Sequence, residues 1–330
     1  MPTFFGSLRR LVLTPKLRDV TFSVRGFPVE PGPATERLEA IPQAVIIGFE
    51  WGIDSRDQWE VERRLALVDP EQRGFAYEGA AMAFTVRDAM GGGNRTRDLL
   101  LGEGHPHIFL TYIGIGFAMA RLPRPLWKKI LPDLTGSPFY PTMNWLVVDG
   151  YGFDLAFFHT KKWVDEQKVP APYPWRGYPD YFLRAVDQGI GRALWFIHGG
   201  RPADVAVAVG KFAEHRQADL WSGVGLAATF AGGSDQEALA KLVGDAGRYA
   251  PDLALGSVFA ITARTFSGFV PQHSTDAVEV LTGLSTEDAL IVAGSTAVEP
   301  EDTGPVPQYE VWRQRIRDHF AGLQNQEKAA

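Results

Sequence analysis

The sequence predicts a mainly α-helical fold in which two tandem halves, each a copy of one ancestral module, pack around an apolar cleft. Three observations lead to this prediction. Stretches rich in Ala, Leu, Arg and Glu recur at helical spacing, convincing strands are scarce, and the second half of the chain repeats the order of elements found in the first. A chain of 330 residues has room for two such halves, since a domain takes roughly 150 residues.

Helical spacing of apolar residues predicts six helices. They are expected at Asp57–Val68, Gly79–Ala89, Tyr181–Trp195, Ala203–Ala213, Asp235–Val243 and Val311–Leu323. The uncharged apolar run from Ile108 to Ala120 is shorter than the roughly 20 residues that a bilayer requires, and we interpret it as a buried helix. Only Gln43–Phe49 and Asn144–Val148 have the character of short strands.

The repeat consists of an opening Gly and Trp segment, a helical stretch, a small-residue helix and a second glycine-bearing helix, in the same order in both halves. We place the first copy near residues 44–163 and the second near 184–297. The matching residues are Gly79 with Gly223, Ala83 with Ala227, Thr85 with Thr229, Gly114 with Gly256 and Phe117 with Phe259. This period is too long for a short-repeat solenoid, so we predict a tandem duplication.

Prolines divide the chain into five predicted parts. These are an N-terminal arm at 1–40, a first helical repeat at 41–169, a Pro-rich linker at 170–180, a second helical repeat at 181–299, and a C-terminal helix and tail at 300–330. The first twenty residues combine Phe4, Phe5 and Leu8 with Arg9 and Arg10. They are interpreted as a short helix that caps the domain, with an amphipathic segment on a membrane surface as the alternative.

Charge and composition exclude several classes of function. The net charge of −6 argues against nucleic acid as a partner, because a nucleic-acid binder needs a basic face. The absence of cysteine excludes disulfides, thiolate zinc sites, iron–sulfur clusters and cysteine nucleophiles. It fits a reducing compartment, so we expect a cytoplasmic protein, with association with a membrane surface as the alternative.

Small and aromatic residues point to a binding site for a hydrophobic small molecule. Glycine within a helix costs about 1 kcal/mol relative to alanine, so its use needs a reason. The reason is either close helix packing or the wall of a channel. The many aromatic side chains either fill the core or offer stacking surfaces to a polyene or similar conjugated chain. The predicted substrate-binding residues are Trp51, Gly79, Tyr112, Gly114, Trp195, Trp221 and Gly223.

Acid–base chemistry is predicted for Glu50, Glu78 and Tyr77. Glu78 lies inside an apolar run, where a carboxyl group must be paired or have a raised pKa. The alternative for Glu78 is a structural ion pair with an arginine such as Arg87 or Arg121. The sequence contains no H-E-x-x-H or D-D-x-x-D metal signature, no P-loop and no complete dinucleotide motif. We therefore expect no metal and no cofactor.

Five segments carry a resemblance to a known family. They are 41–52 (IPQAVIIGFEWG), 73–83 (RGFAYEGAAMA), 112–122 (YIGIGFAMARL), 149–153 (DGYGF) and 187–195 (DQGIGRALW). In these segments the chain resembles the UnbL-type proteins, a family of unknown function that accompanies enediyne polyketide synthases in actinobacterial gene clusters. The likeness extends from about Arg25 to Val298.

The resemblance implies a place in enediyne biosynthesis, as an accessory protein. Such a protein would bind, and in one version process, the linear polyene made by an iterative polyketide synthase. One alternative is a non-catalytic scaffold that contacts the synthase or a membrane-bound pathway protein. Another is a cofactor-independent cyclase of a different polyketide or terpenoid pathway. Whether the protein is an enzyme stays open at this point.

Overall fold

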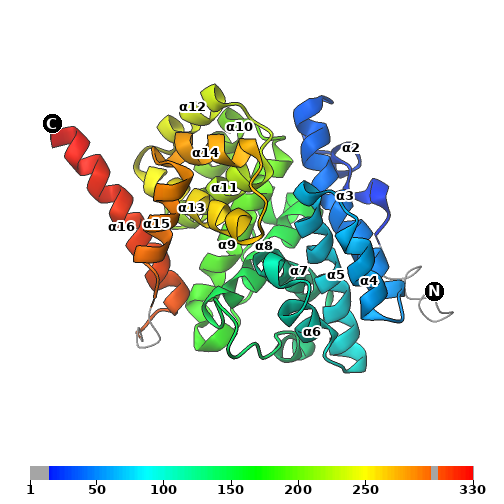
Figure 1. Ribbon diagram of the computed structural model, residues 1–330. Coiled ribbons are helices and arrows are strands. Elements are labelled where there is room, and N and C mark those ends of the chain that lie inside the picture. Colours follow the sequence, from blue (N-terminus) through cyan, green and yellow to red (C-terminus); the bar gives the residue numbers. More distant parts are fainter. Residues whose placement is uncertain (1–14, 299–303, 330) are drawn as a thin grey trace.

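The computed structural model describes residues 15–298 and 304–329, and within these ranges all regular secondary structure is helical (Figure 1). The predicted helical fold class is therefore confirmed, and each of the six predicted helices overlaps an observed one. The two strand predictions were wrong. Gln43–Phe49 lies within helix α3 (Pro33–Asp54), and Asn144–Val148 spans a 3₁₀ turn and the start of α8 (Leu146–Phe158). A short apolar run does not distinguish a strand from a helix that is buried on most sides.

Seven helices form a row in which each helix packs against the next in the sequence. Their bounds are Pro33–Asp54 for α3, Pro70–Gly91 for α5, Ile108–Arg121 for α7, Leu146–Phe158 for α8, Pro179–Ile197 for α9, Glu214–Ala231 for α11 and Ala250–Phe266 for α13. Figure 1 shows this order as a colour gradient from blue to orange across the molecule. The run from Ile108 to Ala120 is the buried helix α7, as predicted.

Glycines hold the helices of this row at very short separation. At each crossing, the space for a glycine Cβ is filled by backbone atoms of the neighbouring helix. The glycines and the residues whose carbonyl oxygens they approach are Gly48 and Ala76, Gly79 and Val45, Gly114 and Glu78, Gly116 and Val147, Gly150 and Ile113, Gly152 and Val186, Gly189 and Asp149, Gly191 and Leu220, Gly223 and Gln188, Gly225 and Leu253, and Gly256 and Ser222. In α7, α8, α9 and α11, the first glycine of a Gly-x-Gly pair faces the preceding helix and the second faces the following helix.

This arrangement accounts for the internal echo without two halves. Gly79 and Gly223, which match in the sequence, both contact the helix that precedes them in the row. The same holds for Gly114 and Gly256. The same kind of glycine contact recurs at every crossing of the row, and the row continues without a break past the predicted linker, because α8 and α9 cross as closely as the other pairs. Two tandem halves facing a shared cleft are not confirmed.

Shorter helices cover the row. They are α4 (Gln58–Ala66), α6 (Arg95–Leu101), α10 (Pro202–Gly210), α12 (Gln236–Ala246), α14 (Gln272–Thr282) and α15 (Thr286–Ser295). Helices α10, α12 and α14 alternate in the chain with α9, α11 and α13 and pack side by side as an outer layer. The C-terminal helix α16 (Gln308–Ala329) packs against α13 and α15 and then extends away from the body (Figure 1).

The row curves so that α11 and α13, towards its end, approach α5, near its start. The ring of Phe75 on α5 lies 5.5 Å from the ring of Phe230 on α11, edge to face. Arg264 on α13 donates a hydrogen bond of 3.2 Å to the backbone carbonyl of Glu71 on α5. These contacts join residues far apart in the sequence and enclose the inner faces of α5, α7, α8, α9, α11 and α13.

The predicted domain boundaries meet the helices in different ways. Helix α3 begins at Pro33 and continues through the predicted boundary at residues 40 and 41. The predicted linker at 170–180 has no regular structure at 170–174, then forms a 3₁₀ turn at Trp175–Gly177 and enters α9 at Pro179. Residues 1–14, which contain most of the proposed amphipathic segment, lie outside the described residues. Within the described part of the chain, no helix has the length and apolar character needed to span a membrane.

Candidate functional site

Two small cavities lie inside the curved row. The first has a volume of about 50 Å³ and is enclosed by α5, α7, α9, α11 and α13, with residues from the turn before α8. The second has a volume of about 60 Å³ and is enclosed by α3, α5, α7, α8 and α9. Phe75, Arg192 and Phe196 border both cavities. The two spaces are therefore neighbours, separated by a wall of three side chains.

The walls of both cavities are mainly apolar and aromatic. Phe153 forms the centre of an aromatic cluster, with its ring 5.7 Å from Phe117, 5.6 Å from Phe157 and 5.4 Å from Phe196. All four rings border the second cavity. Aromatic faces and edges of this kind pack well against flat, unsaturated carbon chains.

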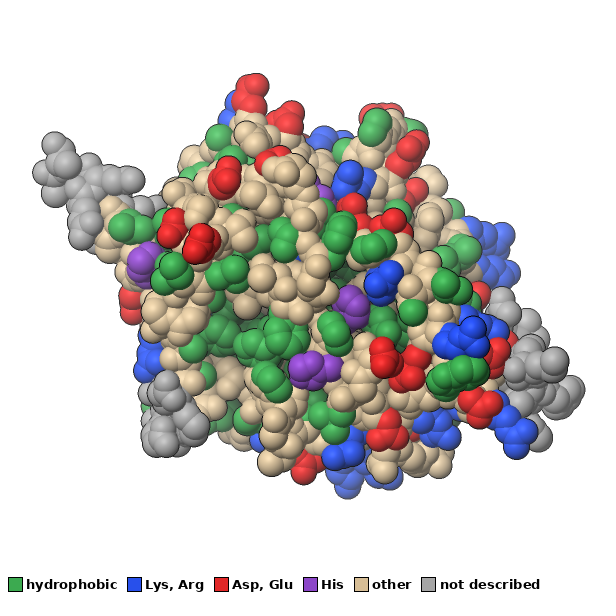
Figure 2. All heavy atoms as spheres, viewed as in Figure 1, with side chains coloured by type: hydrophobic (Ala, Val, Ile, Leu, Met, Phe, Trp, Pro, Cys, Tyr) green, Lys and Arg blue, Asp and Glu red, His purple; other side chains and the backbone are tan. Residues whose placement is uncertain are grey.

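The first cavity lies next to an aromatic cluster that reaches the surface. Phe109 borders this cavity, and its ring lies 4.8 Å from Phe139 and 5.8 Å from Phe266, both of which are half-buried. His105 adds an edge-to-face contact with Phe266 at 5.5 Å. On the face shown in Figure 2, hydrophobic side chains gather in the middle with histidines beside them, while many charged side chains lie nearer the rim. This face therefore carries an apolar patch.

Glu78 supplies a buried acid to the second cavity. Its residue is 3% exposed and it borders the cavity from α5. Burial raises the pKa of its carboxyl group to about 8, with nearby Asp149 adding to the rise and Arg192 opposing it. Among the described residues, we find no hydrogen-bond donor to the carboxyl group. Glu78 is therefore mostly protonated at neutral pH, which makes it a hydrogen-bond donor inside an apolar space.

Arg192 supplies the positive charge beside it. This residue projects from α9 and its Nε donates a hydrogen bond of 2.6 Å to Oδ1 of Asp149 on α8. Its Nη2 also pairs with Asp149, and its guanidinium lies 5.0 Å from the centre of the Phe153 ring. Burial raises the pKa of Asp149, and the charge of Arg192 opposes that rise. The pair keeps a charged group stably inside the core.

The other predicted catalytic residues lie away from both cavities. Tyr77 is buried next to Glu78 in the sequence, but its ring stacks on His107 at 4.7 Å between centres. Burial raises the pKa of Tyr77 to about 12, with Glu103 contributing. Glu50 is half-buried on α3 and does not border either cavity. Their catalytic roles stay predictions, and Glu78 is the member of the three that meets the interior space.

The predicted substrate-binding residues contribute to the framework around the cavities. Gly79, Gly114 and Gly223 lie at helix crossings, as described above. Trp51 is half-buried on α3, whereas Tyr112, Trp195 and Trp221 are buried. Trp195 donates a hydrogen bond of 2.8 Å from Nε1 to the carbonyl of Gly232. These seven residues do not border the two cavities, and direct contact with a ligand stays a prediction.

Sequence reasoning did not place Arg192, Phe153 or Phe196 in the site. A signal for the polar part does exist in the repeat. Glu78 and Asp149 each stand directly before a glycine that contacts the preceding helix. A polar residue at that position, inside an otherwise apolar helix, indicates the inner face of the row.

No group of three or more His, Cys, Asp or Glu side chains in the described part of the chain is arranged to hold a metal ion.

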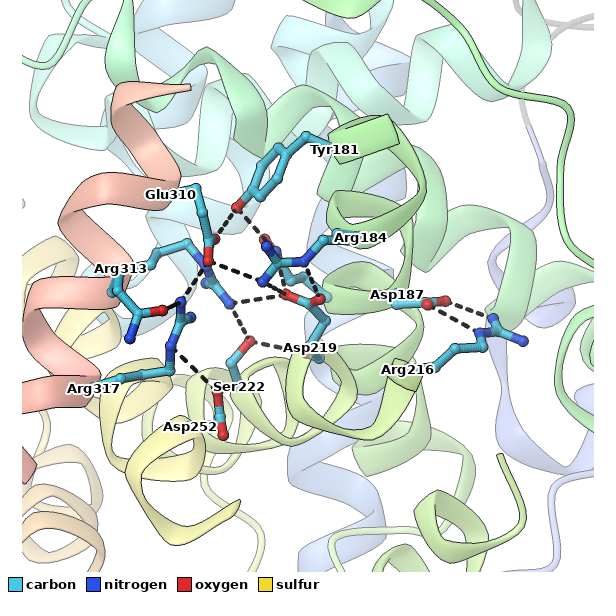
Figure 3. A network of polar contacts seen from close by, with 12 residues as sticks. Tyr181, Arg184, Asp187, Arg216, Asp219, Ser222, Asp252, Glu310, Arg313 and Arg317 are labelled. Carbon is cyan, nitrogen blue, oxygen red and sulfur yellow. Dashed lines mark hydrogen bonds and ion pairs between the residues drawn. The ribbon is translucent and has the colours of Figure 1, made fainter. Parts of the chain in front are cut away.

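A second polar cluster of the interior is rich in arginine and joins α16 to the body of the protein (Figure 3). Glu310 accepts hydrogen bonds from Tyr181 at 2.7 Å and from Arg184 at 2.9 Å. Arg313 donates one of 2.8 Å to Ser222. These contacts indicate a structural role.

The fold and the cavities define a helical protein with an enclosed apolar site that carries a buried acid. The chain belongs to the DUF1702 family, because the family model, described as a protein of unknown function, matches residues 4–320. No curated protein and no solved structure matches the chain. The family assignment covers nearly the whole chain and leaves its link to enediyne synthases as a prediction.

Proposed function

We propose that this protein binds an apolar, unsaturated small molecule between the helices of the row, in the two neighbouring cavities. The observation that carries this proposal is the pair of aromatic-lined spaces that share Phe75, Arg192 and Phe196. The resemblance to UnbL-type proteins supplies the pathway. The ligand is then a linear polyene from an iterative polyketide synthase, and the protein is an accessory of enediyne core formation.

The cavity volumes set a condition on binding. The two spaces of about 50 and 60 Å³ together are smaller than a cavity of about 150 Å³, which holds one benzene molecule. A linear polyene therefore fits only if the shared wall opens and the side chains around both spaces also move apart, because the two spaces joined are still smaller than that cavity. Phe75 and Phe196 are side chains of this wall, and rotation of either would join the two spaces into one channel.

Glu78 is the residue to which we assign any acid–base step. Among Glu50, Glu78 and Tyr77, it alone borders a cavity. A carboxyl group with a pKa near 8 can both donate and accept a proton near neutral pH. Shape control by the walls, together with proton transfer at this one position, would direct folding or cyclisation of a bound polyene.

Titration with the methyl ester of a fluorescent polyene acid tests the binding proposal. Ala227 lines the first cavity and is 3% exposed, so Ala227→Leu fills that space. Ala203 is exposed on α10, and Ala203→Leu is the matched control. We expect wild type and Ala203→Leu to bind alike and Ala227→Leu to bind about tenfold more weakly, since it removes contact area.

Equal affinity in all three proteins, with Ala227→Leu folded by circular dichroism, would refute binding in the cavities. The pathway is tested separately by deletion of the gene in a producing strain. We expect loss of the enediyne product and accumulation of a polyene, and an unchanged product would remove the assignment to this pathway.

A further inference from the structure

The polar groups around the two cavities define the end group of the ligand. Beyond Arg192, the charged residues of the second cavity are Glu78, Arg121 and Asp154. Arg121 and Asp154 form an ion pair with each other. In the first cavity, the only charged lining residue among those described is Arg192. Glu78 and Arg192 are therefore the groups of the second cavity that can form hydrogen bonds with a ligand, and Arg192 also borders the first cavity.

The charges at this point are balanced. Asp149 neutralises Arg192, with 2.6 Å between Arg192 Nε and the carboxylate, and the Glu78 acid is mostly uncharged at neutral pH. A ligand carboxylate would add an unpaired negative charge to an apolar interior, and a ligand amine would add a positive one beside Arg192. A charged end group on the ligand is therefore unfavourable in either sign, because an unpaired charge loses its hydration when it is buried.

Glu78 and Arg192 both offer hydrogen-bond donors to a ligand. A protonated carboxyl group presents an O–H donor, and a guanidinium presents only N–H donors. Among the described residues, none forms a hydrogen bond with the Glu78 carboxyl. A pure hydrocarbon offers this donor no acceptor, so it forgoes a hydrogen bond that an oxygen-bearing ligand can form. The complementary ligand group is a neutral oxygen acceptor.

We propose that the ligand presents a neutral carbonyl oxygen, as in an unsaturated ketone, ester or thioester, to Glu78 and Arg192. Its carbon chain lies against the aromatic walls of the cavities. This inference rests on the proposed function and specifies the chemical class of its ligand. A thioester is the form in which a carrier-bound acyl chain would reach the site.

The proposal predicts a pH dependence of binding. When Glu78 ionises, the donor is lost and a negative charge faces the carbonyl oxygen. The charged groups that face Glu78 are Arg192 on α9 and Asp149 on α8, with the Arg121–Asp154 pair at the same cavity. The lining residues of α3 are apolar. Affinity for a carbonyl ligand therefore falls as the pH rises through about 8.

Three small probes with the same conjugated diene separate the possibilities. Methyl sorbate carries a neutral carbonyl group, sorbate carries a carboxylate, and hexadiene carries no oxygen. At pH 7, we expect wild type to bind methyl sorbate about tenfold more tightly than either of the others, the gain of one buried hydrogen bond. Glu78→Leu should reduce methyl sorbate to the level of hexadiene. Glu78→Gln keeps a donor, so it should keep the preference and lose the alkaline decline.

The outcomes distinguish this inference from the proposed function. Binding of hexadiene and methyl sorbate with equal affinity would overturn the carbonyl assignment and leave the apolar site standing. Tighter binding of sorbate would also overturn it. Binding of none of the three probes would overturn both proposals. If Glu78→Leu does not fold, the pH profile of methyl sorbate binding to wild type decides, and a flat profile from pH 6 to 10 refutes the role of Glu78.

Discussion

Replacement of Gly189 by alanine tests the close packing of the helix row. Gly189 lies on α9 where this helix crosses α8. A Cβ atom at this position would lie 1.9 Å from the carbonyl oxygen of Asp149 and 2.6 Å from the backbone nitrogen of Phe153. Both atoms belong to the backbone of α8, so no side-chain rotation can make space. We therefore expect Gly189→Ala to force the two helices apart.

The magnitude follows from the size of the clash. Carbon atoms and their neighbours pack at about 3.5 Å, so the helices must separate by roughly 1.6 Å at this point. Overpacking of a core costs about 1–3 kcal/mol, and a clash between two backbones belongs to the upper part of that range. Alanine returns about 1 kcal/mol through its better helix propensity. The net loss in the free energy of unfolding is about 2 kcal/mol.

Gly244→Ala is the matched control. Gly244 lies in α12, is exposed, and has no atom within 4 Å of the position of a Cβ. The control should gain up to about 1 kcal/mol, because only the helix propensity changes. Urea unfolding followed by circular dichroism measures both variants. If Gly189→Ala is as stable as Gly244→Ala, the glycines are not required for close helix approach and this account of the fold is refuted.

Two further predictions concern buried carboxyl groups. Burial acts to raise the pKa of Glu310, but Arg313, Arg317 and Arg184 outweigh it and lower the pKa to about 2. Its contribution to stability is thus present above about pH 4.5 and is lost as the pH falls towards 2, on the order of 3 kcal/mol. The free energy of unfolding of Glu310→Gln should lack this loss at acid pH. If it falls with decreasing pH as steeply as that of wild type, the prediction is contradicted. Glu78, with a pKa raised to about 8, has the opposite sign. Wild type should lose stability relative to Glu78→Gln as the pH rises from about 5 to 8. If the difference in the free energy of unfolding between the two proteins stays constant over this range, the raised pKa of Glu78 is contradicted.

The amphipathic helices could be predicted from the sequence because each has one polar and one apolar face. Asp235–Val243 and Val311–Leu323 are examples, and they correspond to α12 and α16. The inner helices lack this contrast. In α3 and α8, apolar and small residues occur around most of the helix, so the strand interpretation of Gln43–Phe49 had nothing to contradict it. In these segments, contacts with residues distant in the sequence decide whether the chain forms a helix or a strand.

The internal echo of the sequence has a physical origin in the helix row. Glycines at crossings recur in every helix of the row, and two helices four steps apart match as well as two halves of a duplication would. Glu78 could be predicted because an acid inside an apolar run needs a special environment. Arg192 and Phe196 could not be assigned to the same site, because only the curvature of the row brings α9 against α5.

Comparison of equivalent positions in the row singles out Glu78. The residue before the glycine that contacts the preceding helix is polar in α5, α8, α9 and α11, namely Glu78, Asp149, Gln188 and Ser222. Asp149 pairs with Arg192. Gln188 donates a hydrogen bond of 2.9 Å to Asp219, and Ser222 accepts one from Arg313 of α16.

Three of these four polar residues therefore hold the helices together. For the fourth, Glu78, the described part of the chain provides no hydrogen-bond partner, although it is as deeply buried as the others. Glu78 borders the second cavity, whereas the other three residues line neither of the two cavities. A ligand that reaches the second cavity can accept a hydrogen bond from the protonated acid, so the one polar residue of the four that does not join helices is the one placed for binding.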